Sequence, residues 1–259
     1  MTSVLGVAPD LLALMMAVGL AAGFLDAIAG GGGLLTVPAY ALAGLDPAAA
    51  VATNKVNGTL GVAAASAAFA RKGVYRGRAP WLLAGGAAAG GAAGALALSS
   101  VPTGWLTLAM PFALIVIALY FAFTPALGDK DRAPRVSIAL AALVFAPLVG
   151  FYDGVFGPGA GSFYMIVCVA LLGRAAVQAT GETKLANLAS NGASLVAFAV
   201  MGKIVWPLGL AVGLAQGIGS ILGARAAMAG GARLIRPLIV LASLAMAARL
   251  ALRAGWFGG

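Results

Sequence analysis

Apolar residues fill long continuous runs of this chain, and short polar clusters separate the runs. Runs of about 20 residues match the length that a helix needs to cross a hydrocarbon core roughly 30 Å thick. No alternation of polar and apolar residues appears, so the pattern indicates helices rather than the strands of a membrane barrel. We predict helical segments at about 11–29, 30–45, 47–70, 79–98, 104–124, 136–156, 157–173, 175–201, 204–229 and 232–254.

Composition supports a location in the membrane. Of 259 residues, 62% are hydrophobic and only 9% are charged, and the mean hydropathy is +1.04. A soluble domain carries roughly 25% charged residues, so this chain cannot coat a water-exposed globule. The 38 glycines suit the close approach of helices in lipid. No basic region precedes the first apolar run, so we expect 11–29 to be a retained helix rather than a signal peptide.

The net charge of +9 does not indicate a nucleic-acid partner, because the basic residues lie in short clusters between apolar runs. The chain has no histidine and one cysteine, Cys168. This composition excludes a disulfide framework and a Cys/His metal site, and it removes the commonest general base. No Walker-type phosphate loop is present. We therefore expect no cofactor, no enzymatic activity and no ATP hydrolysis.

The two halves of the chain resemble each other. Gly23-Phe24-Leu25-Asp26 matches Gly150-Phe151-Tyr152-Asp153 at an offset of 127, which also pairs Gly30 with Gly157 and Gly32 with Gly159. Later matches have an offset of 129: Gly44 with Gly173, Lys55 with Lys184, the segment 69–73 with 198–202, and Gly90 and Gly94 with Gly219 and Gly223. We infer a duplication, common in secondary transporters. One integrated membrane domain would contain an N-terminal repeat (1–128), a cytoplasmic linker (129–135) and a C-terminal repeat (136–259).

Basic residues predict the orientation. The loop 71–78 has four positive charges and the next loop, 99–103, has none, so we place the first inside and the second outside. An odd number of segments per half would invert the second repeat. Inversion places Arg225, Arg233 and Arg236 inside, although Arg249 and Arg253 then lie outside, against the rule. The resulting prediction is an all-α, multi-pass protein of a bacterial cytoplasmic membrane, with two inverted repeats of about five segments and broken or re-entrant helices at Gly-rich turns.

Two glycine clusters, at 30–33 and 157–161, interrupt apolar segments. Each glycine in a helix costs about 1 kcal/mol relative to alanine, and irregular backbone at membrane depth is tolerated only inside protein or beside a water-filled cavity. Helices restarting at Leu34 and near Ser162 would point free N–H groups at that cavity. This favours an anion cradle, with a tight interfacial turn or close helix packing as the alternative. The candidate residues are Gly31, Gly32, Gly33, Gly159 and Gly161.

Two lysines lie inside apolar segments. Lys55 comes nine residues after Asp46 and Lys184 ten residues after Arg174, which puts them about 13–15 Å along their helices. In inverted halves both would arrive near the midplane, where a lysine costs about 2.5–3.5 kcal/mol. We expect them to bind an anion. The alternatives are snorkelling to the interface or a structural ion pair with Glu182, Asp26 or Asp153.

Other polar residues accompany these lysines. Neutral side chains could donate hydrogen bonds to an anion or connect helices; they are Thr53, Asn54, Asn57, Thr183, Asn187 and Asn191. The acidic residues Asp26, Asp153 and Glu182 are candidates for coupling or gating, as proton carriers or as partners of the lysines. The two aspartates could instead cap the turns that follow them. Glycines at four-residue intervals predict helix packing, with Gln216 on the same face; they are Gly86, Gly90, Gly94, Gly209, Gly213, Gly217, Gly219 and Gly223.

Three of these motifs occur in the same order in a known family. Gly-Phe-x-Asp followed by a Gly-rich turn, the Thr-Asn-Lys segment and the Phe-Ala-x-x-Gly end lie within 23–73, and a related series lies within 150–202. In motifs, length and duplication the chain resembles the sulfite exporter TauE/SafE family of membrane transporters. The resemblance implies ion-coupled transport of sulfite, thiosulfate or an organosulfonate.

Our leading hypothesis is therefore a secondary transporter that works by alternating access. Its partners would be a small anion, membrane lipid, and protons or another coupling ion, with no nucleic acid. The alternatives are a transporter of a non-sulfur anion, an intramembrane enzyme acting on a lipid or small substrate, and a membrane-embedded interaction subunit.

Overall fold

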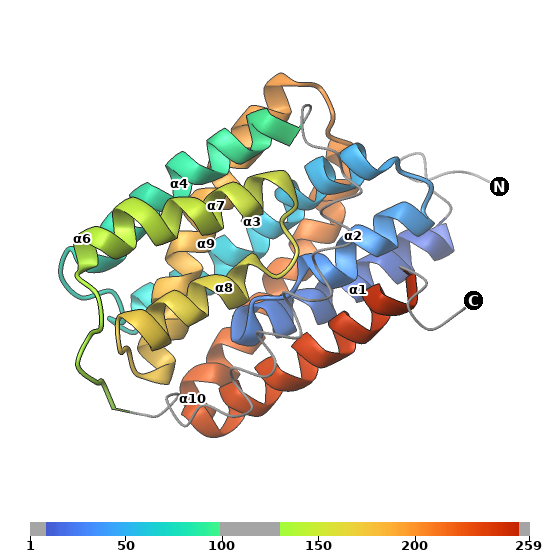
Figure 1. Cartoon of the computed structure of the whole chain (residues 1–259). Helices are drawn as coiled ribbons and strands as arrows, with labels where there is room; N and C mark the ends of the chain where they lie inside the picture. Colours follow the sequence, from blue (N-terminus) through green and yellow to red (C-terminus); the bar gives the residue numbers. More distant parts are fainter. Residues whose placement is uncertain (1–8, 99–129, 254–259) are drawn as a thin grey trace.

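The structure is a computed structural model that describes residues 9–98 and 130–253, so the predicted segment at 104–124 lies outside the described residues. Within those ranges every regular element is helical (Figure 1). The elements are α1 (Pro9–Ala29), α2 (Gly33–Leu42), α3 (Pro47–Arg71), α4 (Ala79–Ala97), α6 (Ile138–Leu140), the π-helix η2 (Ala141–Phe145), α7 (Ala146–Val155), α8 (Ala160–Ile166), the π-helix η3 (Val167–Leu171), α9 (Ala176–Val200) and α10 (Trp206–Arg253).

In the described part of the chain, three helices are long and apolar enough to cross a membrane: Pro9–Ala29, Ile138–Val155 and Trp206–Gly231. The central helices α3 and α9 each have 25 residues, about 37 Å at 1.5 Å per residue. They are less apolar because they carry the polar residues of the middle of the bundle. The prediction of an all-helical protein of membrane type is confirmed, and the helix ends agree with the predicted ends to within a few residues.

The first glycine cluster turns the chain back on itself. Gly30 has a φ of +82°, a conformation that favours glycine, and α2 begins at Gly33 rather than at the predicted Leu34. Tyr40, near the end of α2, packs against Leu12 and Met15 near the start of α1. The helices α1 and α2 therefore form an antiparallel hairpin whose tip is the glycine turn.

The second glycine cluster forms a second hairpin. Gly157 and Gly159 have φ values of +92° and +85°, and α8 begins at Ala160, slightly before the predicted Ser162. The backbone N–H groups of Arg135 and Val136 donate to the carbonyl of Leu171 at 2.8 and 3.3 Å. The start of the α6–η2–α7 arm thus lies beside the end of the α8–η3 arm.

The tips of the two hairpins touch. The Ser162 hydroxyl donates to the carbonyl of Ala29 at 2.8 Å. A Cβ atom on Gly30 or on Gly161 would come closer than 3.0 Å to the backbone of the other residue. Only glycines allow this approach, so the close-packing alternative for the clusters is realised at the tips.

Matched glycines also share unusual backbone conformations. The φ values are +82° and +92° at Gly30 and Gly157, +91° and +67° at Gly44 and Gly173, and +67° at both Gly73 and Gly202. These are the pairs that the sequence offsets of 127 and 129 align. The sequence repeat therefore has a counterpart in the backbone at three separate turns.

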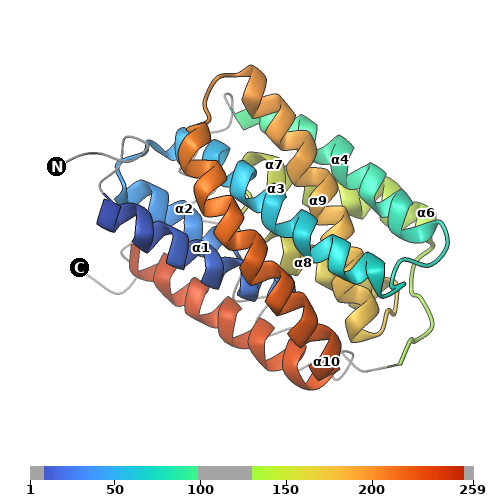
Figure 2. The same cartoon turned by 180° about the vertical axis from the view of Figure 1, so that it is seen from behind.

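Helices from different halves pack through glycine. A Cβ on Gly90 would collide with the carbonyl oxygen of Pro147 in α7, and one on Gly219 of α10 would collide with that of Leu20 in α1. The helix α10 has two arms that meet at Gly231, where φ is +50° and ψ is −145°. In Figures 1 and 2 the turns after α3 and after α9 lie at opposite ends of the bundle. The contact of Gly90 with α7 and that of Gly219 with α1 confirm the predicted packing role of the spaced glycines.

We expect Gly90→Ala to destabilise the protein by about 1–3 kcal/mol, because an overpacked contact would force α4 and α7 apart. Gly85→Ala is the matched control, since Gly85 is an exposed residue of the same helix and a Cβ there meets nothing within 4 Å. The control should leave stability unchanged or raise it by up to about 1 kcal/mol. Thermal unfolding in detergent measures both, and equal behaviour of the two variants would contradict the packing argument.

Candidate functional site

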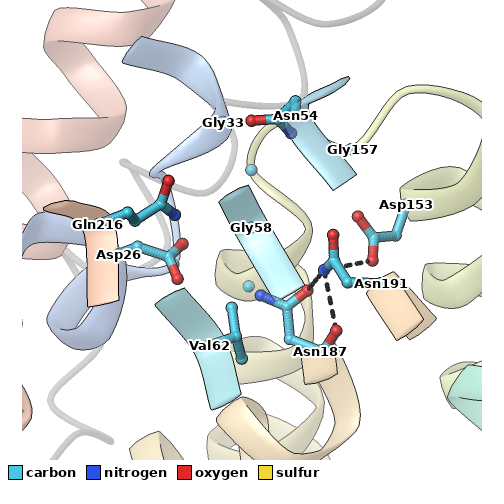
Figure 3. Close-up of a pocket in the computed structure, with 13 residues that line it drawn as sticks. Asp26, Gly33, Asn54, Gly58, Val62, Asp153, Gly157, Asn187, Asn191 and Gln216 are labelled. Atoms are coloured by element: carbon cyan, nitrogen blue, oxygen red, sulfur yellow. Dashed lines mark hydrogen bonds between the residues drawn. The ribbon is translucent and has the colours of Figure 1, made fainter. Parts of the chain in front are cut away.

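A small polar pocket lies where the two hairpin tips meet the central helices α3 and α9 (Figure 3). About 20 Å³ of it is open to the centre of a water molecule, which is room for about one water. The pocket is therefore nearly closed in this conformation. Its lining is Asp26, Gly30, Gly33, Asn54, Gly58, Val62, Asp153, Gly157, Gly159, Gly161, Asn187, Asn191 and Gln216.

Much of the lining comes from equivalent positions of the two halves. Asp26 and Asp153 are both present, and so are Gly30 and Gly157, at the offset of 127. Two further pairs have the offset of 129, namely Gly58 with Asn187 and Val62 with Asn191. The pocket is thus shared by the halves, but its chemistry differs from one half to the other.

Asp153 has a full set of partners. Its Oδ1 lies 2.8 Å from Nζ of Lys55, which also donates to the backbone carbonyl of Asp153. Its Oδ2 accepts hydrogen bonds from the Ser190 hydroxyl and, at 3.0 Å, from the Asn191 amide. Lys55 is 0% exposed and Asp153 only 1%. One cation and two neutral donors thus surround this carboxylate.

Asp26 is held more loosely. Its Oδ2 lies 3.5 Å from Nζ of Lys184, which donates to the backbone carbonyl of Asp26. Its Oδ1 accepts from the backbone N–H of Gly32 at 3.0 Å. Among the described residues Oδ2 has no hydrogen-bond donor. The predicted free N–H groups of the first glycine turn thus include one that already binds a carboxylate.

The ion pairs are exchanged between the halves. Lys55 of the first half pairs with Asp153 of the second, and Lys184 of the second pairs with Asp26 of the first. Both lysines are 0% exposed, so neither snorkels to an interface. The ion-pair alternative is present in the structure, with the aspartates and not Glu182 as partners. Breaking such a buried pair by removing one charge typically costs about 3–5 kcal/mol.

The predicted neutral ligands divide into two groups. Asn54, Asn187 and Asn191 line the pocket; Asn54 accepts from the Thr36 hydroxyl at 2.5 Å, and Asn187 accepts from Asn191 at 2.7 Å. The others are engaged outside the lining. Thr53 accepts from the Val205 N–H at 3.1 Å, Thr183 lies 3.8 Å from Cys168 Sγ, and the Asn57 amide is hydrogen-bonded to Tyr40 at 2.8 Å and Gln216 at 2.6 Å.

The remaining predicted residues are also placed. Gly33, Gly159 and Gly161 line the pocket, whereas Gly31, Gly32 and the two lysines stand outside the lining. Glu182 accepts from Gln178 at 2.8 Å and pairs with Arg174 at 3.2 Å, and it is not part of the pocket. In the described ranges no three His, Cys, Asp or Glu side chains are close enough together to hold a metal ion.

Sequence reasoning missed Ser190, which binds Asp153, and it missed the lining residues Gly58 and Val62. The signal was available in the offset of 129, because Ser190 and Asn191 align with Gly61 and Val62. Ser190 and Asn191 also follow Asn187 at helical spacings of three and four, which places all three on one face of α9.

The charges of the site balance, with two cations and two anions around one pocket. Net charge is costly in a buried environment. An anion can therefore enter only if a positive charge enters with it or if one carboxylate loses its charge. This constraint is the chemical property that the arrangement offers.

Comparisons with known proteins agree with this picture. The family model for the sulfite exporter TauE/SafE matches residues 15–250. A probable membrane transporter protein of Sinorhizobium sp. is 44% identical, over 93% of this chain and 92% of that protein. A probable membrane transporter protein of Haemophilus influenzae is 42% identical, over 96% and 97%, and one of Escherichia coli is 41% identical, over 94% and 91%. No solved structure gives a significant match.

We expect Lys55→Met to lower the free energy of unfolding by about 3–5 kcal/mol, because it leaves the buried Asp153 carboxylate without its cation. The double variant Lys55→Met/Asp153→Asn should recover most of this loss, since no charge then remains unpaired. Lys203→Met, at an exposed residue of the turn after α9, serves as the control for loss of a positive charge. A double variant less stable than Lys55→Met would contradict the ion-pair assignment.

Proposed function

Because this chain belongs to the sulfite exporter TauE/SafE family, we propose that it is a secondary transporter of small sulfur-containing anions across the bacterial cytoplasmic membrane. Sulfite, thiosulfate and organosulfonates are the candidate substrates. The family and its relatives, named probable membrane transporters, favour transport over an enzymatic role. The observation that carries the proposal is the buried, charge-balanced pocket between the two halves.

The substrate would bind in this pocket through Lys184 and Lys55. A Cβ on Gly157 would lie 3.2 Å from Nζ of Lys55, so only glycine backbone separates that ammonium from the lining. Asn54, Asn187 and Asn191 supply neutral polar groups on the walls. An anion that replaces a carboxylate beside its lysine would gain a charge-assisted hydrogen bond, provided that the carboxylate takes up a proton and leaves no unpaired charge behind.

Alternating access would follow from inverted repeats that rock against each other around the pocket. Three features support this proposal: the two hairpins meet tip to tip, the ion pairs are exchanged, and the turns after α3 and α9 lie at opposite ends of the bundle (Figures 1 and 2). The repeats 1–128 and 136–259 would be the moving units. The groups nearest the pocket that could act as nucleophile or base are engaged with carboxylates, which does not favour the enzyme alternative.

Transport by proteoliposomes tests the binding site. We expect the purified chain to take up labelled sulfite, thiosulfate or a short sulfonate. Lys184→Met/Asp26→Asn should fold, because both charges are removed, but should lose at least about tenfold in uptake, since a hydrogen bond to a charged group contributes about 1.5–3 kcal/mol.

The exposed Lys203→Ala is the matched control and should transport normally. If the double variant folds and transports at the native rate, Lys184 has a structural role only. If the native protein moves none of the sulfur anions, the substrate class is wrong.

Cysteine labelling tests the inverted topology. In a Cys168→Ser background, Lys72→Cys and Lys203→Cys place single thiols in the exposed turns after α3 and α9. A membrane-impermeant maleimide should label Lys72→Cys only from the cytoplasmic side and Lys203→Cys only from outside. Labelling of both from one side would contradict inversion.

A further inference from the structure

We propose that Asp26 is the carboxylate that takes up a proton when the pocket admits an anion, whereas Asp153 stays ionised as the fixed partner of Lys55. This inference rests on the transport function proposed above and specifies how that transport is coupled. It predicts that the two aspartates, although equivalent in the repeat, have different roles.

The contacts of the two carboxylates carry the argument. Three donors from three side chains, Lys55, Ser190 and Asn191, reach the carboxylate oxygens of Asp153. The Oδ2 of Asp26 has only the ammonium of Lys184 at 3.5 Å and, among the described residues, no hydrogen-bond donor. Figure 3 shows Asp153 bonded to Asn191 and Asp26 on the side of the pocket where Gln216 lies. Asp26 is 5% exposed and lines the pocket, so its side chain lies beside the space that a substrate or proton would enter.

The amino-acid sequence explains this difference. Ser190 and Asn191 align, at the offset of 129, with Gly61 and Val62. Those residues offer no side-chain donor, and Val62 is itself part of the pocket wall. Hydrogen bonds to the ionised form lower the proton affinity of a carboxylate, and their absence in a buried place raises it. The first half therefore lacks the two side-chain donors that bind its counterpart.

The charged surroundings of Asp26 point in the same direction. Its helix, α1, packs against α2, α3, α8, α9 and α10. Of these, α9 presents Lys184, and the arginines of α10 whose side chains are described, Arg225 and Arg233, are exposed. The helices α2 and α8 have no charged residue, and their titratable groups are Tyr40 and Tyr164. The helix α3 contains Lys55, which is paired with Asp153, and Arg71, which is exposed. On α9, Glu182 is paired with Arg174. Lys184 is thus the cation that balances Asp26, and Asp153, also in the pocket lining, adds a like charge that favours protonation.

The coupled step conserves charge in the pocket. A proton binds to Oδ2 of Asp26, and the electrostatic attraction between the Asp26 carboxyl group and Lys184 falls. The ammonium of Lys184 then pairs with the incoming anion, so one proton and one negative charge enter together. Release reverses the step, because the departing anion leaves Lys184 unbalanced and Asp26 gives up its proton. Because Asp26 is the one carboxylate that takes up a proton in this scheme, the predicted stoichiometry is one proton for each anion bound, which balances the charge of a monoanion such as methanesulfonate.

Proton uptake on substrate binding tests this scheme. The purified full chain in lightly buffered detergent is mixed with thiosulfate or methanesulfonate, which stay ionised near neutral pH, and a pH indicator reports protons taken up. The native protein should take up a proton with the anion. Asp26→Asn keeps an oxygen acceptor for the Gly32 N–H, and it should bind the anion with no proton uptake and with an affinity that no longer depends on pH.

A matched pair of variants tests the role of the missing donors. Val62→Asn places an amide at the position equivalent to Asn191, where it would stabilise the ionised form of Asp26. It should shift the pH of half-maximal uptake toward lower values by about one unit. Asn191→Val removes the corresponding donor from Asp153 and one polar group of the binding site, so it should weaken anion binding while the pH of half-maximal proton uptake stays at the native value.

The outcomes separate this inference from the proposed function. If the native protein transports the anion and Asp26→Asn still takes up as many protons as the native protein, the assignment of Asp26 is wrong. The proposed transport function would be unaffected by that result. A shift with Asn191→Val but none with Val62→Asn would move the titrating group to Asp153. If the native protein neither binds nor transports any of the sulfur anions, the proposed function is wrong, and this inference is wrong with it.

Discussion

The exchange of buried ion pairs between the two halves is the constraint on which the rest of the structure depends. Neither Lys55 nor Lys184 is exposed, and a single buried charge is far more costly than a matched pair. Each half therefore has to place its aspartate within reach of the lysine of the other half. The glycine turns end α1 and α7 near the middle of the bundle, and the glycine faces of α4 and α10 allow the close approach that this requires.

The close packing of the two halves and the equal number of positive and negative charges at the pocket together determine what the pocket can bind. A site with equal numbers of cations and anions is stable when empty, yet it contains the positive charges that an anion needs. A cavity lined only by cations would be unstable without substrate, and one lined only by neutral amides would bind an anion weakly. In the mechanism proposed above, the positive charge of a lysine would become available to an anion when its partner carboxylate is neutralised.

Much of the architecture could be predicted from the sequence, because long apolar runs, glycine clusters and a repeated motif are local or periodic signals. The breaks at 30–33 and 157–161, the packing glycines and the importance of Lys55 and Lys184 all follow from such signals. The sequence left the partners of the lysines open, because no local pattern specifies the distance between a lysine of one half and an aspartate of the other. Ser190 was missed because a lone serine on a helix indicates nothing until the face that it occupies is known. Glu182, next but one to Lys184 in sequence, instead faces Arg174.

In the transport mechanism proposed above, the tip-to-tip contact of the hairpins would be part of the barrier between the two sides of the pocket. At that point glycine backbone lies against glycine backbone, with one side-chain hydrogen bond from Ser162 to Ala29 across it. No bulky side chain has to withdraw for the tips to part, and a hydrogen bond of this kind contributes about 0.5–1.5 kcal/mol net. In that mechanism, the insulation of the membrane would depend on the fit of two turns rather than on a plug, so leakage and gating would be two aspects of the same contact.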